Sequence, residues 1–246
     1  MTRVALVTGG SRGIGRGIAQ TLARRGMRVV LTFNEHADDA SAVVNELEKD
    51  GHEALAIQML AERRSSITEA LEIVRCRWGP VNILVNNAAI AQEKPFDTIT
   101  DHDWDHMMAV NLRGPFICAQ ECLPDMIERD WGRIINITSI GGQWGGFNQV
   151  HYAASKAGLI NLTRSLAKLY SGNRITTNAV AVGLVQTDMS AAELATEAGQ
   201  EKAKAIPRGR LGTIQDIADT VAFLASEQAD YITGQTINLN GGMHFG

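Results

Sequence analysis

The sequence predicts an α/β fold in which a parallel sheet is covered by helices on both faces. Short apolar runs recur along the chain, at residues 4–7, 29–31, 83–85, 134–137 and 179–182. They are continuous rather than alternating, which is typical of strands buried on both faces. Segments with helical periodicity separate them, and this alternation, joined by right-handed crossovers, predicts an open doubly wound sheet.

The first helix is indicated by its periodicity and by its end. Ile14, Ile18 and Leu22 recur every four residues and define one helical face. Gly26 follows at the place where a helix commonly ends in a C-cap glycine.

Two later helices are indicated by capping residues. Ser66 and Glu69 have the spacing of a capping box, and Thr213 with Asp216 gives a looser version of the same signal. Each pair precedes an apolar helical stretch, so we expect helices to start there.

A single long helix is predicted over residues 104–128, after a start at Thr100 that acidic residues favour. Pro124 should kink or break it near its end, and Pro115 lies within it as well. His102 and His106 stand four apart near this start and suggest a metal face. With no third ligand in sight, we favour a solvated helix start and expect no metal.

The composition is that of one globular domain, residues 1–246, with 45% hydrophobic and 20% charged residues. The net charge of −4 and the lack of a basic stripe argue against nucleic-acid binding. Cys76, Cys118 and Cys122 are too few and odd in number for a disulfide framework. The first apolar run is too short for a signal peptide or membrane span, so we expect a cytoplasmic protein with no membrane partner.

A glycine-rich turn follows the first strand, with the sequence Thr8-Gly9-Gly10-Ser11-Arg12-Gly13-Ile14-Gly15. Glycines at positions 9, 13 and 15 allow a tight turn and close approach of the backbone to a pyrophosphate. The helix that opens at Ile14 adds its N-terminal N–H groups. A plain tight turn is the alternative, but the position between strand and helix favours a dinucleotide.

The end of the second strand favours NADP over NAD. A carboxylate there would bind the ribose 2′-hydroxyl and select NAD, but the chain reads Thr32-Phe33-Asn34, and its acidic residues come later. Arg12 could meet a 2′-phosphate with the help of Asn34. The alternative for Arg12 is a solvated loop cation.

The candidate catalytic residues are Ser139, Tyr152 and Lys156. Tyr152 and Lys156 stand four apart, so a helix places them on one face. A nearby ammonium lowers the pKa of a phenol, which can then pass a proton to a reduced carbonyl. This pair alone is common by chance. Ser139 strengthens it because it follows an apolar strand, at the edge where ligands bind.

The motifs resemble, in order and spacing, those of the short-chain dehydrogenase/reductase family over essentially the whole chain. The further matching residues are Asn86-Asn87-Ala88, Asn111, Gly183 with Thr187, and Asn240-Gly241-Gly242. The resemblance implies a three-layer doubly wound Rossmann fold with a parallel seven-stranded sheet. The pattern is most similar to 3-oxoacyl-carrier-protein reductases, which implies NADPH-dependent reduction of a 3-oxoacyl thioester (of acyl-carrier protein or CoA) and a homotetramer.

Roles follow from the resemblance, residue by residue. Tyr152 would protonate the substrate oxygen, and Ser139 would hydrogen-bond that oxygen. Lys156 would hold the nicotinamide ribose and lower the pKa of Tyr152. Asn111, in the fourth helix, would hold a water that relays protons to Lys156. Cofactor contacts are implied at Asn87, Ala88, Val185 and Thr187, besides Tyr152, Lys156 and the residues named above (Gly9, Ser11, Arg12, Gly13, Ile14, Gly15 and Asn34).

Three positions depart from the family pattern. Ala89 replaces a glycine, Leu60 stands where an adenine-binding Asp is usual, and Val182 replaces a proline. Residues 183–212, with a helix expected over 191–205, are a candidate substrate lid. The alternatives are a dehydrogenase of a sugar, polyol or other secondary alcohol, and an NADP-sensing protein without turnover, which Leu60 and Val182 motivate.

Overall fold

The computed structural model describes residues 2–187, 190–191 and 194–245. Its centre is a seven-stranded sheet in the order β3-β2-β1-β4-β5-β6-β7, with every neighbouring pair parallel. The strands are β1 Val4–Val7, β2 Arg28–Phe33, β3 Ala54–Gln58, β4 Ile83–Asn86, β5 Gly132–Ser139, β6 Ile175–Val182 and β7 Thr236–Leu239. The predicted seven-stranded, doubly wound fold is therefore confirmed.

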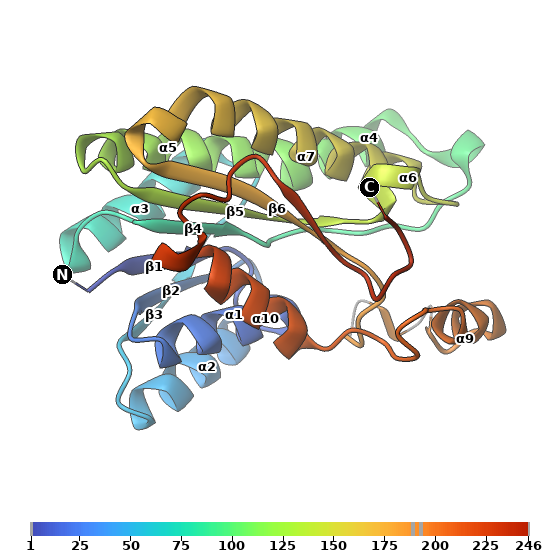
Figure 1. Cartoon of the computed structure of the whole chain (residues 1–246), viewed down its shortest axis with the longest axis horizontal. Helices are drawn as coiled ribbons and strands as arrows, with labels where there is room; N and C mark the ends of the chain where they lie inside the picture. Colours follow the sequence, from blue (N-terminus) through green and yellow to red (C-terminus); the bar gives the residue numbers. More distant parts are fainter. Residues whose placement is uncertain (1, 188–189, 192–193, 246) are drawn as a thin grey trace.

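Helices cover the sheet on both faces, as Figure 1 shows. The α-helices are α1 Gly13–Arg24, α2 Ala37–Lys49, α3 Arg64–Trp78, α4 Asp101–Met108, α5 Gly114–Glu128, α6 Gly141–Trp144, α7 Val150–Tyr170, α9 Glu197–Lys204 and α10 Ile214–Leu224. Short 3-10 turns lie at η1 Phe96–Thr98, η3 Ser171–Asn173 and η4 Glu227–Ala229, and a π-helical segment, η2, spans Ala109–Arg113.

Two apolar clusters hold the three layers together. Alternate residues of β1 divide between them, because successive side chains of a strand point to opposite faces. Ala5 and Val7 pack with α1, α2 and α10, whereas Val4 and Leu6 pack with α3 and α5. All four side chains are almost fully buried, which explains why the central strands read as continuous apolar runs.

Two strands of the sheet have no counterpart among the apolar runs found in the sequence. The strands β3 and β7 form the two edges of the sheet. Neither is buried throughout: β3 ends in the exposed Gln58, and all of β7 is only half-buried. An edge strand carries polar residues on its open side, so its hydrophobic signal is weaker than that of a central strand.

The predicted single helix over residues 104–128 is wrong. The chain forms α4, then the π-helical segment η2, then α5. Pro115 explains the break, because it has no N–H to donate to the carbonyl of Asn111 and its ring would clash there in a regular α-helix. Pro124 is accommodated inside α5. Thr100 is the N-cap of α4 and forms a capping box with Asp103.

The other predicted helix ends are partly right. Thr213 and Asp216 form the capping box of α10, and Gly26 follows α1 with a φ of 83°. The capping box at Ser66 is wrong: α3 begins at Arg64, and the Ser66 hydroxyl accepts from the Leu60 N–H.

In the expected lid, α9 covers part of the predicted 191–205 helix, and residues 192–193 lie outside the described part. In the described part of the chain, no helix is long and apolar enough to cross a membrane. The three cysteines are free, with Cys118 and Cys122 buried.

Candidate active site

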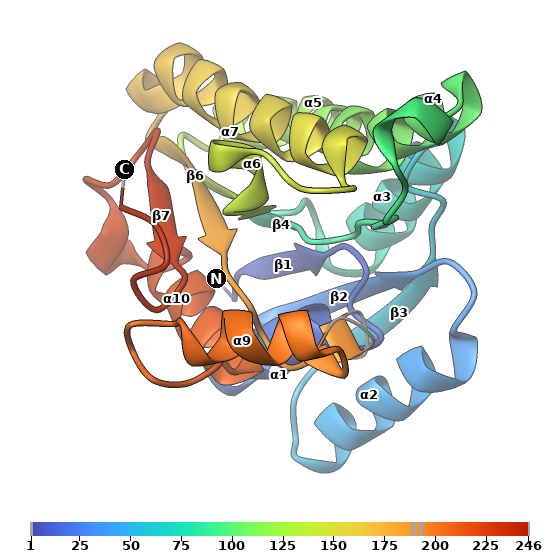
Figure 2. The same cartoon turned by 90° about the vertical axis from the view of Figure 1, so that its right-hand side faces the viewer.

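The carboxyl ends of β1 and β4 mark the place where the strand order reverses. From β1 the chain winds outward through β2 and β3, and it then returns to begin β4 on the other side. Ligands of open α/β sheets bind in the crevice outside this switch point. Figure 2 looks onto this edge, with α6, α9 and the start of α7 around it.

The backbone of the glycine-rich turn is so tight that residues with side chains cannot replace its glycines. Gly9 and Gly13 have φ angles of 64° and 53°, in the left-handed region. A Cβ on Gly15 would lie 2.2 Å from the Gly9 carbonyl oxygen. Because α1 has no side-chain cap at Arg12, its first N–H groups remain available to an anion. The cradle fits a pyrophosphate.

Thr8 and Asn87 lock this turn to the end of β4. The Thr8 hydroxyl accepts from the N–H groups of Asn87 (3.0 Å) and Ala88 (2.9 Å). The Asn87 side-chain amide donates to the carbonyls of Thr8 (2.9 Å) and Gly9 (3.0 Å). Asn87 thus shapes the cradle from behind. The contribution of Thr8 was missed in the sequence, although its place at the end of β1 was visible.

The adenosine side of the site carries a cation and an apolar surface. Arg12 and Asn34 are both exposed, and the described residues give neither side chain a hydrogen bond or ion pair. They remain available to a 2′-phosphate. Leu60 is half-buried just after β3, with its N–H bonded to Ser66. The part of the site expected to bind adenine therefore has the apolar side chain of Leu60 where the family pattern has an Asp.

Ser139, Tyr152 and Lys156 come together at the end of β5 and the start of α7. Ser139 is the last residue of β5, and its Oγ accepts from the Gly141 N–H at 3.1 Å and is hydrogen-bonded to Tyr152. The Lys156 Nζ lies 5.6 Å from the centre of the Tyr152 ring and donates to the Ile137 carbonyl at 3.0 Å. An ammonium has three donors, so two remain for a ligand.

The protonation of this group differs from the sequence-based expectation. Desolvation raises the pKa of Tyr152, and the hydrogen bond with Ser139 only partly opposes it. Burial lowers the pKa of Lys156 to about 8. The ammonium is not among the causes that act on Tyr152, so the expected lowering of its pKa is not found. A phenol that keeps its proton at neutral pH is suited to act as an acid.

Asn111 lies in the π-helical segment η2 rather than in a regular fourth helix. Its side chain is fully buried and bonds both backbone groups of Ile90 at 2.9 Å. Its amide also donates to the Ser155 hydroxyl at 3.2 Å, and that hydroxyl donates to the Tyr152 carbonyl. Asn111 therefore links the segment after β4 to the helix that carries Tyr152.

The nicotinamide side follows β6. Val185 is buried and forms a parallel bridge with Gly212, which closes the base of the expected lid. The Thr187 N–H and hydroxyl both bond the Ser190 hydroxyl. A Cβ on Gly183 would lie 2.8 Å from Asn240, so this glycine permits the close passage of β6 and the C-terminal segment.

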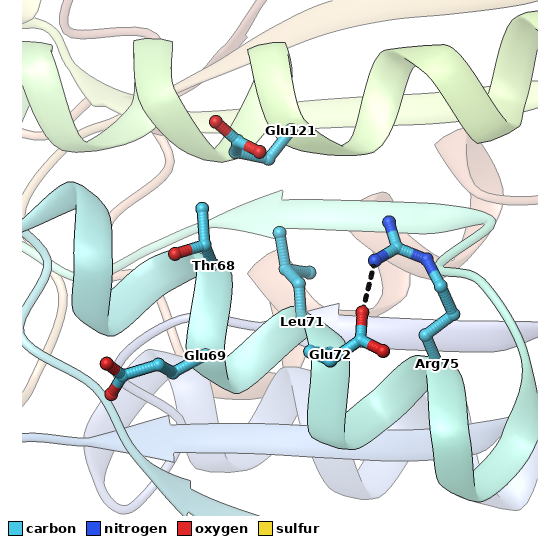
Figure 3. Close-up of a pocket in the computed structure, with 6 residues that line it drawn as sticks. All are labelled: Thr68, Glu69, Leu71, Glu72, Arg75 and Glu121. Carbon is cyan, nitrogen blue, oxygen red and sulfur yellow. Dashed lines mark hydrogen bonds and ion pairs between the residues drawn. The ribbon is translucent and has the colours of Figure 1, made fainter.

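Two hollows lie away from this site. One, of about 330 Å³, is lined by Thr68, Glu69, Leu71, Glu72, Arg75 and Glu121 (Figure 3). The Arg75 guanidinium in this hollow forms ion pairs with Glu72 and Asp125. The hollow therefore contains surface ion pairs rather than a reactive group.

The other hollow, of about 1080 Å³, lies along α4, η2 and α5 and includes His102 and His106. These two rings stack 6.2 Å apart. No group of three or more possible metal ligands occurs among the described residues.

Comparisons with known proteins agree with this arrangement. The family model described as enoyl-(acyl carrier protein) reductase matches residues 9–244. A 3-oxoacyl-[acyl-carrier-protein] reductase of Staphylococcus epidermidis is 43% identical over 99% of this chain and 100% of its own length. The enzyme of that name from Escherichia coli is 41% identical over 98% of this chain and 97% of its own. A crystal structure from Agrobacterium tumefaciens, provisionally assigned as a gluconate dehydrogenase, superposes with a TM-score of 0.95. It is 34% identical and covers 98% of this chain and 95% of its own.

Proposed function

Since the chain belongs to the short-chain dehydrogenase/reductase family, we propose that it reduces the keto group of a 3-oxoacyl thioester to a secondary alcohol with NADPH. The observation that carries the proposal is the grouping of Ser139, Tyr152 and Lys156 at the same carboxyl edge of the sheet as the glycine cradle. The thioester is carried by acyl-carrier protein or CoA, as the names of the relatives suggest, and the reaction belongs to fatty acid biosynthesis.

The residues of the chain divide the work of the reaction. NADPH supplies the hydride when bound. The cradle of Gly9, Gly13 and Gly15 would hold the pyrophosphate, and Lys156 would donate its two remaining N–H groups to the ribose hydroxyls. Val185 and Thr187 would hold the carboxamide at the base of the lid, residues 183–212.

Ser139 and Tyr152 act on the substrate oxygen. Because the Ser139 oxygen already accepts from Gly141, its hydrogen can be donated to the carbonyl oxygen. Tyr152 keeps its proton at neutral pH, since desolvation raises its pKa. It gives this proton to the oxygen as charge develops there.

The experiment is a spectrophotometric assay of NADPH consumption by the purified protein with acetoacetyl-CoA and a panel of other ketones. We expect NADPH to be consumed with acetoacetyl-CoA. Binding of NADPH without consumption across the panel would point instead to an NADP-sensing protein and overturn the proposal.

A second candidate activity is oxidation of a sugar acid or polyol. It is favoured by the likeness to the solved structure from Agrobacterium tumefaciens. Assaying NADP reduction with gluconate and simple polyols separates the two activities. Faster turnover of these alcohols than of acetoacetyl-CoA would select the second candidate.

We also propose a homotetramer in the cytoplasm. On α7 the small residues Ala154 and Ala157 keep exposed surface and would allow another helix to approach closely, whereas Ala153 is buried and Gly158 already packs against Leu112. Sedimentation of the purified protein measures the assembly.

A further inference from the structure

The helix that carries Tyr152 begins without a cap of its own. The N-cap of α7 is Gln149, whose side chain makes no capping hydrogen bond. Tyr152 is the third residue of this helix, and the first N–H groups of a helix have no partner within it. The first hydrogen bond within the helix runs from the Ala153 N–H to the Gln149 carbonyl at 2.8 Å. The N–H of Tyr152 therefore takes no part in it.

Three consecutive residues from another part of the chain contact residues at this uncapped end of the helix. The Lys94 N–H donates to the Asn148 carbonyl at 2.6 Å. The Gln149 amide donates to the Glu93 carboxylate at 3.2 Å. Because both contacts reach residues just before α7, this segment 92–94, hereafter the strap, lies against the start of the helix that carries Tyr152.

The third contact of the strap is buried, and it determines the tautomer of His151. The His151 Nε2 lies 2.8 Å from the Gln92 Oε1, and the His151 side chain is 0% exposed. The Gln92 amide nitrogen donates to Asp103 at 3.1 Å, so its oxygen faces the ring as an acceptor. His151 must therefore carry its proton on Nε2. Its Nδ1 is buried with no hydrogen-bond partner among the described residues.

Asp103 holds the strap in place. Its carboxylate accepts from the Gln92 amide at 3.1 Å and from the Lys94 ammonium at 2.5 Å. It also accepts from the N–H and hydroxyl of Thr100, the N-cap of α4, and so completes the capping box. The Lys94 bond, followed by those of Thr100 and Gln92, holds the pKa of Asp103 well below its ordinary value. The carboxylate therefore stays ionised at neutral pH.

The same charges bear on His151. Burial lowers its pKa, the Asp103 carboxylate opposes this, and the Lys94 ammonium adds to it. The ring is therefore neutral at pH 7, which matches the single proton that the bond to Gln92 requires.

We propose that the strap, which is bound to Asp103 and hydrogen-bonded to His151, is a positioning device that fixes where the Tyr152 phenol lies. The strap holds the first turn of α7, from which the phenol projects.

The groups that would bind NADPH are held separately: Lys156, one turn further along, by the Ile137 carbonyl, and the cradle by Thr8 and Asn87. Loss of the strap contacts therefore acts on the proton donor and leaves NADPH binding unchanged. This inference rests on the proposed role of Tyr152 as the acid.

The test compares four variants. In His151→Leu the side chain still fills the space but has no donor, whereas His151→Gln places an amide N–H near the lost Nε2. Gln92→Met removes the acceptor from an exposed side chain, so its folding is not at risk. Gln215→Met is the matched control, because Gln215 is also an exposed glutamine, hydrogen-bonded to Asp219 on α10.

Hydrogen exchange of the Ala153 and Ala154 amides and steady-state kinetics are then measured for each. In His151→Leu and Gln92→Met we expect exchange about fivefold faster, as for loss of one hydrogen bond. We also expect kcat about tenfold lower, with an unchanged NADPH Kd. His151→Gln should restore both quantities, and Gln215→Met should match wild type.

Exchange and kcat equal to wild type in Gln92→Met would overturn the proposal, as would a kcat loss in His151→Leu that His151→Gln does not restore. If the wild-type protein reduces no ketone, the proposed function fails on that result alone. The exchange rates still decide whether the strap holds the start of α7.

Discussion

Replacing Gly15 by alanine tests the cofactor cradle most sharply. The new methyl would lie 2.2 Å from the Gly9 carbonyl oxygen and 2.6 Å from the Asn87 amide nitrogen. Ordinary contacts of a Cβ lie at 3.4–4 Å, and both neighbours belong to the lock between β1 and β4, so the turn must move. The shift breaks the 3.0 Å hydrogen bond from Asn87 to Gly9.

The size of the effect follows from these two contacts. The lost hydrogen bond costs about 1 kcal/mol, and the overlap adds at least about 1 kcal/mol more. Because the cradle itself is displaced, we expect about 2 kcal/mol to be lost from NADPH binding, which is about thirtyfold in Kd.

Titration of NADPH by fluorescence measures this Kd, and two other glycines provide controls. Gly172→Ala introduces a methyl with no atom within 4 Å and should bind NADPH like wild type. Gly17→Ala meets the Ile214 side chain at 2.1 Å, so it should lower thermal stability through the packing of α1 on α10. Wild-type affinity in Gly15→Ala, or an equal loss in Gly172→Ala, would refute the account of the cradle.

Three further predictions concern charge and capping. Reduction should slow as the pH rises through about 8, where buried Lys156 loses the proton it needs to hold the ribose; a pH profile of kcat/KM that rises there would contradict this. Arg12→Ala should weaken NADPH binding about tenfold and leave NADH binding unchanged, because a hydrogen bond to a charged group contributes about 1.5 kcal/mol; equal losses for both in fluorescence titrations would speak against a 2′-phosphate contact. Thr213→Ala removes the N-cap of α10 and should cost about 1 kcal/mol, which calorimetry should detect as a Tm lower by about 2–4 °C; an unchanged Tm would show that Asp216 caps the helix alone.

Much of the site was predictable because its signals are local. Tyr152 and Lys156 share a helix, and the glycines of the first turn stand next to one another, so spacing alone places them. Ser139 was predictable because it ends a strong apolar strand. The long central strands were equally clear, since burial on both faces gives them a continuous apolar sequence.

The features that were missed depend on contacts between distant residues or on burial. The strap contacts join residues more than fifty positions apart, and nothing near Gln92 indicates its partner His151. The raised pKa of Tyr152 depends on desolvation, which spacing does not reveal. The π-helical segment at Asn111 is the exception, because Pro115 is visible in the sequence although the helical pattern around it is otherwise regular.

The most direct test of the proposed reaction is Tyr152→Phe, which removes the hydroxyl and keeps the ring. With acetoacetyl-CoA we expect kcat to fall at least about a hundredfold, the usual contribution of a general acid, while the NADPH Kd stays at the wild-type value. Turnover close to wild type in this variant would contradict the assignment of Tyr152 as the proton donor.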